Sequence, residues 1–256
     1  SHSYIDRDNV VNGRCVDLRR FSKITVFTNL CLAGLLLVVG IVCFYPLGIS
    51  TVSQQSEHVY YEGDRKSRYV SPMFHVYAGE SYVPQILDVL DDYGVTATFF
   101  IGGCWADDYA GVLREIVLRG HELGNCGYFC LDPGKLSYER NQEEIRLCGE
   151  LIQMLTGESM SLFSSPYGHD SDEVIKAAES LGYNVIQWSK DTTARQDQDM
   201  ALIFERATDG VCGGDLVLMH PTAETVKALP SILQNYLENG LEPVRVSVNI
   251  AGVAQG

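Results

Sequence analysis

Two features of the sequence predict an α/β protein in which a barrel-like domain follows one transmembrane helix. Short apolar segments alternate with helix-like segments from residue 69 onward, and a long uncharged run stands near the N-terminus. Strands that alternate with helices favour a parallel sheet covered by helices. The predicted organisation is a cytoplasmic segment 1–23, a transmembrane helix 24–48, a polar tether 49–67, a folded domain 68–249 and a tail 250–256.

The uncharged run extends from Ile24 to Leu47. A bilayer core needs roughly 20 apolar residues in a helix, so this run has the length of a membrane span. A buried core helix is one alternative, but such helices usually show a polar face. A cleaved signal peptide is a second alternative, but its apolar region typically covers only about 7–15 residues.

Flanking charge sets the predicted orientation. Five Lys or Arg residues precede the run, whereas residues 48–55 contain none. The positive-inside rule therefore places the N-terminus in the cytoplasm and the folded domain outside the cell membrane. The chain carries a net charge of −14, and residues 1–23 carry +2, which leaves −16 for the rest. This acidity argues against nucleic acids and anionic polymers as partners.

Hydrophobic periodicity places the elements of the domain in order. Strands are expected over 69–77, 96–101, 161–163, 184–187, 215–219 and 242–248, and helices over 83–93, 109–119, 137–156, 171–181, 197–208 and 222–239. If the sheet closes into a barrel, its site lies at the carboxyl ends of the strands. Residues at those ends are His75, Gly102–Cys104, Cys126, Ser164–Tyr167, Asp191 and His220.

Five collinear segments between about Val70 and Val248 carry a family resemblance. They are residues 82–102 (Tyr-Val-Pro-Gln-Ile-Leu-Asp-Val-Leu-Asp-Asp-Tyr-Gly-Val-Thr-Ala-Thr-Phe-Phe-Ile-Gly), Gly120–Asn125, Ser165–Gly168, Leu181–Asp191 and Leu216–His220. Together they resemble the polysaccharide deacetylase (NodB-homology, carbohydrate esterase family 4) proteins, with some similarity to the Gram-positive, sporulation-associated subgroup. The resemblance implies a distorted (β/α) barrel of the polysaccharide deacetylase type. It also implies removal of acetyl groups from glycans by a divalent metal held by one Asp and two His, with an Asp base and a His acid.

The sequence departs from this family pattern at the metal and base positions. The base position is His75, the metal Asp position is Val76, and the two metal His positions are Cys126 and Cys130. The Arg expected before Pro166-Tyr167 is replaced by Ser164 or Ser165. The fourth motif keeps Asp191 but has Ala194-Arg195 in place of an acidic-aromatic pair, and the fifth keeps His220.

These substitutions lead to two functional hypotheses. The first is a pseudoenzyme that binds cell-wall glycan or a membrane or envelope protein, with no cofactor, in which His75, Asp191, His220 and Tyr167 occupy the former catalytic positions. The alternative is an active de-N-acetylase with a rebuilt zinc site, because a Cys₂His set made of His75, Cys126 and Cys130 suits Zn²⁺ and leaves a position for water.

The cysteines allow a further reading of the same pocket. Cys126 and Cys130 are disulfide candidates, since disulfides persist outside the cell when the two Cα atoms lie within about 7 Å. Cys104 follows a strand and is expected to reach the rim of the pocket. Cys148 and Cys212 are interpreted as packing residues.

Overall fold

The structure is a computed structural model that describes residues 26–36, 59–196 and 199–253. The chain divides into two units, Ser1–Gln55 and Ser56–Gly256. In the first unit the described residues form a helix over 26–36. The rest of the predicted span 24–48, the segment 1–23 and residues 49–58 of the predicted tether lie outside the described residues. Among the described residues, no helix is long and apolar enough to cross a membrane.

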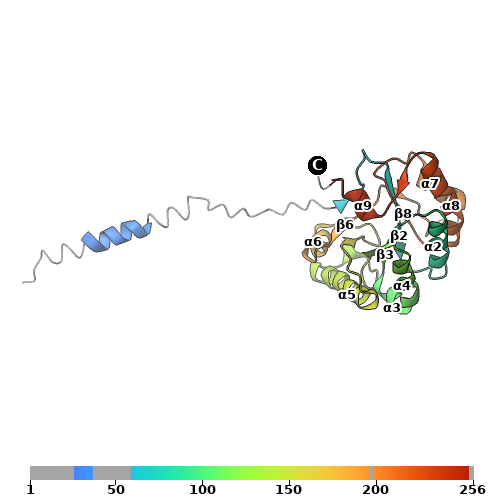
Figure 1. Ribbon diagram of the computed structural model, residues 1–256. Helices are drawn as coiled ribbons and strands as arrows, with labels where there is room; N and C mark the ends of the chain where they lie inside the picture. The colour runs from blue at the N-terminus through green and yellow to red at the C-terminus, as the bar shows by residue number, and fades with distance from the viewer. Residues whose placement is uncertain (1–25, 37–58, 197–198, 254–256) are drawn as a thin grey trace, which may run out of the picture. The chain divides into compact units, whose positions relative to one another are not determined.

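The second unit is built on one curled parallel sheet, which confirms the predicted α/β class (Figure 1). The strand order is β1-β6-β5-β4-β3-β2-β8-β7, and β9 pairs with β2 beside this path. In the described part of the chain no ladder joins β1 to β7, so the sheet is a half-barrel and not a closed barrel. The strands are β1 Val59–Tyr60, β2 Tyr69–Val76, β3 Thr98–Ile101, β4 Glu122–Asn125, β5 Leu162–Phe163, β6 Asn184–Ile186, β7 Lys190–Asp191, β8 Leu216–Met219 and β9 Glu242–Pro243.

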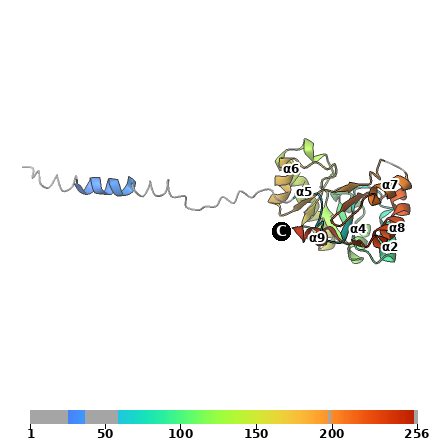
Figure 2. The ribbon, with the colours of Figure 1, turned by 90° about the horizontal axis from the view of Figure 1, so that it is seen from above.

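Helices cover the outside of the sheet, as Figures 1 and 2 show. The predicted helix ends are close to the observed ones: Ser137 caps α5 through its hydroxyl, and Gly157 ends it with φ of 81°. Glycine is favoured at this position because the backbone there adopts a left-handed conformation. The helices are α2 Val83–Asp92, α3 Gly103–Asp108, α4 Ala110–Leu118, α5 Tyr138–Thr156, α6 Asp172–Ser180, α7 Met200–Thr208, α8 Ala223–Glu238 and α9 Val246–Ile250, with a 3-10 turn η1 at Pro133–Lys135.

Successive side chains of β2 point to opposite faces of the sheet. Phe74 and Val76 belong to the large core between the sheet and the helices. Met73 belongs to a smaller inner cluster on the concave side, and His75 contacts Phe100 of that cluster. Because side chains on a strand alternate between its two faces, His75 is directed to the inner side while Val76 packs among the helices.

The C-terminal part of the domain corrects one predicted element. A single strand was expected over 242–248, but the chain forms the short strand β9 and then the helix α9. Val246, Asn249 and Ile250 are the buried residues of α9. Their spacing of three and four residues places them on one helical face.

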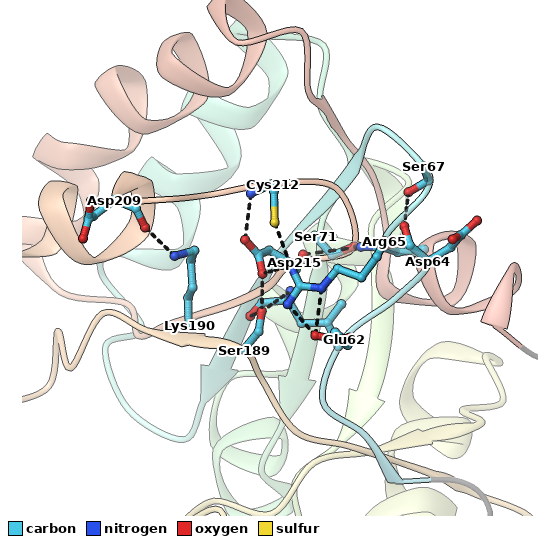
Figure 3. A network of polar contacts seen from close by, with 12 residues as sticks. Glu62, Asp64, Arg65, Ser67, Ser71, Ser189, Lys190, Asp209, Cys212 and Asp215 are labelled. Carbon is cyan, nitrogen blue, oxygen red and sulfur yellow. Dashed lines mark hydrogen bonds and ion pairs between the residues drawn. The ribbon is translucent and has the colours of Figure 1, made fainter.

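Residues 59–67, which we assigned to the polar tether, contribute to the folded domain. Strand β1 pairs in parallel with β6. Arg65 then forms an ion pair with the buried Asp215 (Nη1–Oδ1 2.9 Å), and Glu62 binds the same guanidinium through a hydrogen bond from Nε (2.8 Å) (Figure 3). Gly213 lies so close to Ser67 that a Cβ atom there would be 1.9 Å from the Ser67 carbonyl oxygen. This close approach requires glycine, and the domain includes these residues.

Candidate functional site

The carboxyl ends of the parallel strands meet at one edge of the half-barrel, which we call the mouth. Strands β2, β3 and β8 are in register, with Phe74 aligned to both Phe99 and Met219. The residues that follow these strands therefore lie near one another.

His75 is paired with a serine at the predicted base position. It is 1% exposed, and its Nε2 lies 2.8 Å from Oγ of Ser164, the residue that follows β5. Burial, followed by the nearby His220 and Arg195, holds the pKa of His75 well below its usual range, so the ring is neutral. Ser164 is itself fully buried. The pair is a neutral hydrogen bond inside the domain, and its hydroxyl is closed to a substrate.

His220 stands beside His75 at the end of β8. The two rings meet edge to face with centroids 5.8 Å apart, and Tyr77 packs against His220 at the same separation. Nδ1 of His220 is buried and has no hydrogen-bond partner among the described residues. Burial and the charge of Arg195 lower the pKa of His220 to about 4. The retained histidine is therefore neutral near pH 7.

Asp191 is separate in its bonding from these histidines. It ends β7, and its Oδ1 accepts a hydrogen bond from the backbone N–H of Thr193 (2.7 Å). Among the described residues no hydrogen bond or ion pair joins it to His220. The structure thus places both retained motif residues at the mouth but does not couple them as an acid and its partner.

Cys126 and Cys130 contact each other at the end of β4. Both are free thiols in the structure, and the Cys130 thiol donates to the Gly127 carbonyl (3.9 Å). The loop between them turns back through Gly127, with φ of 80°, and Cys130, with φ of 50°. Burial, followed by the contact with Cys130, raises the pKa of the Cys126 thiol well above its usual range. The predicted disulfide is not formed here, although the two side chains meet.

The residues at the family's metal positions do not fit that metal. Val76 has no donor atom and is fully buried in the outer core. The Cys126 thiol is held protonated by its burial, whereas metal ligation needs the thiolate. Among the residues that the structure describes, no three His, Cys, Asp or Glu side chains are placed to share a metal ion. The alternative set of His75, Cys126 and Cys130 is therefore not assembled, because His75 is bound to Ser164 instead.

An aromatic pocket opens at the mouth beside these residues. Its volume is about 220 Å³, and we call it the mouth pocket; its lining residues are Tyr77, Cys104, Trp105, Phe129, Cys130, Pro166 and Tyr167. Cys104, which we expected at the rim, and Tyr167 both line this pocket. Flat apolar side chains with a few polar atoms are typical of small-molecule pockets.

Arg195 lies across two tyrosines of this pocket. Its guanidinium carbon is 5.6 Å from the ring centroid of Tyr77 and 5.9 Å from that of Tyr167. Its Nη1 also donates a hydrogen bond to the Tyr77 hydroxyl (2.8 Å). An arginine over an aromatic face is attracted by the negative potential of the ring. Sequence reasoning noted Arg195 only as a departure from a motif and missed this role, together with those of Tyr77, Trp105 and Phe129.

Cys148 is a packing residue as predicted, whereas Cys212, also interpreted as a packing residue, is exposed. Cys148 is fully buried in the outer core, and its thiol donates to the carbonyl of Ile101 (3.3 Å). Cys212 lies at the opposite end of the strands, where its sulfur accepts a hydrogen bond from Arg65.

Comparison with known proteins defines the family. A family description named polysaccharide deacetylase matches residues 62–186. A peptidoglycan-N-acetylglucosamine deacetylase of Bacillus cereus is 30% identical over 173 residues, which cover 65% of this chain and 81% of that protein. The chain belongs to the polysaccharide deacetylase family.

Individual relatives refine this assignment. The uncharacterized protein YlxY of Bacillus subtilis is 28% identical over 73% of this chain, which spans only 59% of its length. Among solved structures, wild-type BA3943 from Bacillus anthracis, described as a family 4 pseudoenzyme, is similar with a TM-score of 0.73, 27% identity and coverage of 75% and 68% of the two chains. A BA3943 mutant described as having restored enzymatic activity is 26% identical, with a TM-score of 0.73 and coverage of 75% and 71%.

Proposed function

We propose that this chain is a membrane-anchored, catalytically silent deacetylase relative that binds cell-wall glycan in the mouth pocket. The observation that carries the proposal is the chemistry at the metal positions. A family fold is retained, but its donor set has become a buried valine and two cysteines, of which Cys126 is fully buried. Without an activated water and an electrophile, the retained His220 has no reaction to assist.

The mouth pocket supports the binding part of the proposal. Tyr77, Trp105, Phe129 and Tyr167 supply broad rings, and sugar rings present C–H faces that pack against such surfaces. The similarity to BA3943 supports the loss of activity, and the similarity to peptidoglycan deacetylases supports cell-wall glycan as the ligand class.

The anchor and the location of the domain outside the cell belong to the same proposal. They rest on the uncharged run 24–48 and on the basic residues before it. We expect the chain to fractionate with membranes and to be cut by external protease after residue 48 in intact protoplasts. Protection of the domain from the protease would overturn the orientation.

Acetate release tests the loss of activity. The chain is incubated with chitooligosaccharide or peptidoglycan, with or without added Zn²⁺, Co²⁺ or Mn²⁺, and no acetate is expected above the level of a heat-treated sample. Metal-dependent release that disappears in His75→Ala or Cys126→Ser would overturn the proposal in favour of the rebuilt zinc site.

Restoring the family's base and metal-ligand residues gives a positive counterpart to this acetate assay. A variant with His75→Asp, Val76→Asp, Cys126→His and Cys130→His supplies the family residues in the same fold, and we expect metal-dependent acetate release. The same variant with Val76 retained lacks one metal ligand and serves as its control. Equal activity of these two variants would show that the metal positions are not the ones identified here.

A further inference from the structure

The charge of Arg195 is not compensated by any carboxylate in the described part of the chain. Four other arginines of the domain bind acidic side chains, namely Arg65, Arg119, Arg140 and Arg146. Arg195 instead binds a hydroxyl and two rings. It is exposed, so its remaining N–H donors face solvent beside the two tyrosines that line the pocket.

The nearest motif carboxylate is not paired with Arg195 in the described part of the chain. Asp191 stands four residues before Arg195, and its Oδ1 accepts a hydrogen bond from the backbone N–H of Thr193. The mouth therefore holds an arginine without an ion-pair partner among the described residues.

A second observation at the same place indicates a missing polar partner. Nδ1 of His220 is buried and has no hydrogen-bond partner among the described residues, and its ring packs against Tyr77, the residue that also binds Arg195. A buried ring nitrogen without a partner carries a desolvation cost. Arg195 and the His220 ring thus both contact Tyr77, which lines the pocket.

We infer that the mouth pocket takes a glycan bearing a free carboxylate, and that Arg195 binds this carboxylate while the aromatic side chains pack against the sugar. The inference rests on the proposed glycan-binding function and specifies its ligand. A planar guanidinium matches a carboxylate with two parallel hydrogen bonds. The acidic surface of the domain repels long polyanions, but a single carboxylate on an otherwise neutral sugar meets the local cation.

Intrinsic fluorescence provides the readout. The chain has two tryptophans. Trp105 lines the pocket, and the Trp188 ring meets His75 at 5.6 Å. The full chain is titrated with the disaccharide of N-acetylglucosamine and N-acetylmuramic acid, which has a free carboxylate, with the methyl ester of the same disaccharide, and with chitobiose. We expect the free acid to bind about tenfold more tightly than the ester, as one charge-assisted contact provides.

Two variants assign the preference to Arg195. Arg195→Gln keeps a polar side chain but removes the charge, and it is expected to bind the acid and the ester equally. Arg195→Lys keeps the charge and loses the paired N–H donors, and it is expected to retain about a threefold preference. Circular dichroism spectra that match the wild type exclude a folding defect.

The possible results separate this inference from the function on which it rests. Equal binding of acid, ester and chitobiose by the wild type would overturn the carboxylate inference and leave glycan binding intact. Tighter binding of chitobiose by Arg195→Gln than by the wild type would also overturn the carboxylate inference, because Arg195 would then only cover the pocket. Absence of binding by all three sugars would overturn both proposals.

Discussion

Arg65 and Arg195 lie at opposite ends of the same strands. The charge of Arg65 is paired with carboxylates, whereas that of Arg195 contacts tyrosines. Arg65 lies beside the start of β8, where the buried Asp215 and the exposed Glu62 both bind it (Figure 3). Arg195 lies at the mouth, where it contacts tyrosines and no carboxylate of the described chain. A paired charge fixes one chain segment to another, whereas an unpaired charge over an open pocket remains available to a ligand. The amino ends of the strands therefore hold the paired arginine, and the carboxyl ends hold the unpaired one to which we assign ligand binding.

Removal of the buried carboxylate is expected to give the largest effect. Asp215 is 2% exposed, and besides Arg65 it accepts hydrogen bonds from Ser189 Oγ (2.8 Å) and the Cys212 N–H (2.9 Å). Asp215→Ala leaves these donors without a partner, so we expect the free energy of unfolding to fall by about 3 kcal/mol in urea denaturation. The control is Glu150→Ala, which breaks the exposed pair with Arg146 and is expected to cost less than about 0.5 kcal/mol. Similar losses for the two variants would contradict the structural role of the Arg65 network.

Acidification tests two buried histidines, His220 at the mouth and His121 just before β4, and gives the second-largest expected effect. Burial lowers the pKa of His121 and of His220 to about 4 in the folded chain, compared with 6.5 for an unperturbed histidine. The unfolded chain therefore takes up protons first as the pH falls. The contribution to stability is complete above pH 6.5 and is lost between pH 6.5 and about 4, at no more than about 1.4 kcal/mol per pH unit for each histidine.

Thermal unfolding at pH 7.0, 6.0 and 5.0 measures this loss, and His121→Asn provides the control. Nδ1 of His121 accepts a hydrogen bond from the backbone N–H of Ala97 (3.2 Å). An asparagine oxygen can accept the same bond without titrating, so the variant should lose less stability on acidification. A wild-type stability that does not change from pH 7 to pH 5 would show that these histidines are not buried in their neutral form.

The smallest expected effect concerns the charge at the mouth itself. Burial is the main cause of the low pKa of His220, and the charge of Arg195 is the second. Arg195→Gln should therefore raise the His220 pKa, by about half a unit, because the side chain is exposed and water screens its charge. Titration followed by NMR measures this shift, with Arg146→Gln as a distant control. An unchanged His220 pKa in Arg195→Gln would mean that the arginine points away from the mouth.

Most of the fold could be predicted from the sequence because its strands are short apolar runs between periodic helices. The failures concern elements whose signal is ambiguous or too short. Residues 244–250 alternate apolar and polar like a strand, but Val246–Ile250 form the helix α9, which buries Val246, Asn249 and Ile250 on one face and leaves Val248 exposed. Strand β4 reads Glu-Leu-Gly-Asn and β1 is only Val59–Tyr60, so neither has a pattern long enough to interpret.

The candidate site was predictable where a strand fixes a residue and not where a loop does. His75, Asp191 and His220 were expected at strand ends, and parallel pairing places them there. The position of Arg195 depends on a turn in which Thr193 has φ of 47°, a conformation that few threonines adopt. No sequence pattern announces that turn, and the contact of Arg195 with Tyr77 spans 118 residues. The bond between His75 and Ser164 depends in the same way on two strands that are distant in sequence.

The docking of residues 59–67 has a mechanical consequence. Any pull on the chain from its N-terminal side loads the two-residue ladder between β1 and β6 first. The next points to bear the load are the bond from the Gly63 N–H to the Gly214 carbonyl (2.7 Å) and the ion pair between Arg65 and Asp215. The Gly63–Gly214 bond and the ion pair lie beside the start of β8, at the amino ends of the strands, whereas β1 pairs with the carboxyl-terminal half of β6. A domain held by its N-terminus would thus transmit the load first to β6 and only then to the amino ends of the strands.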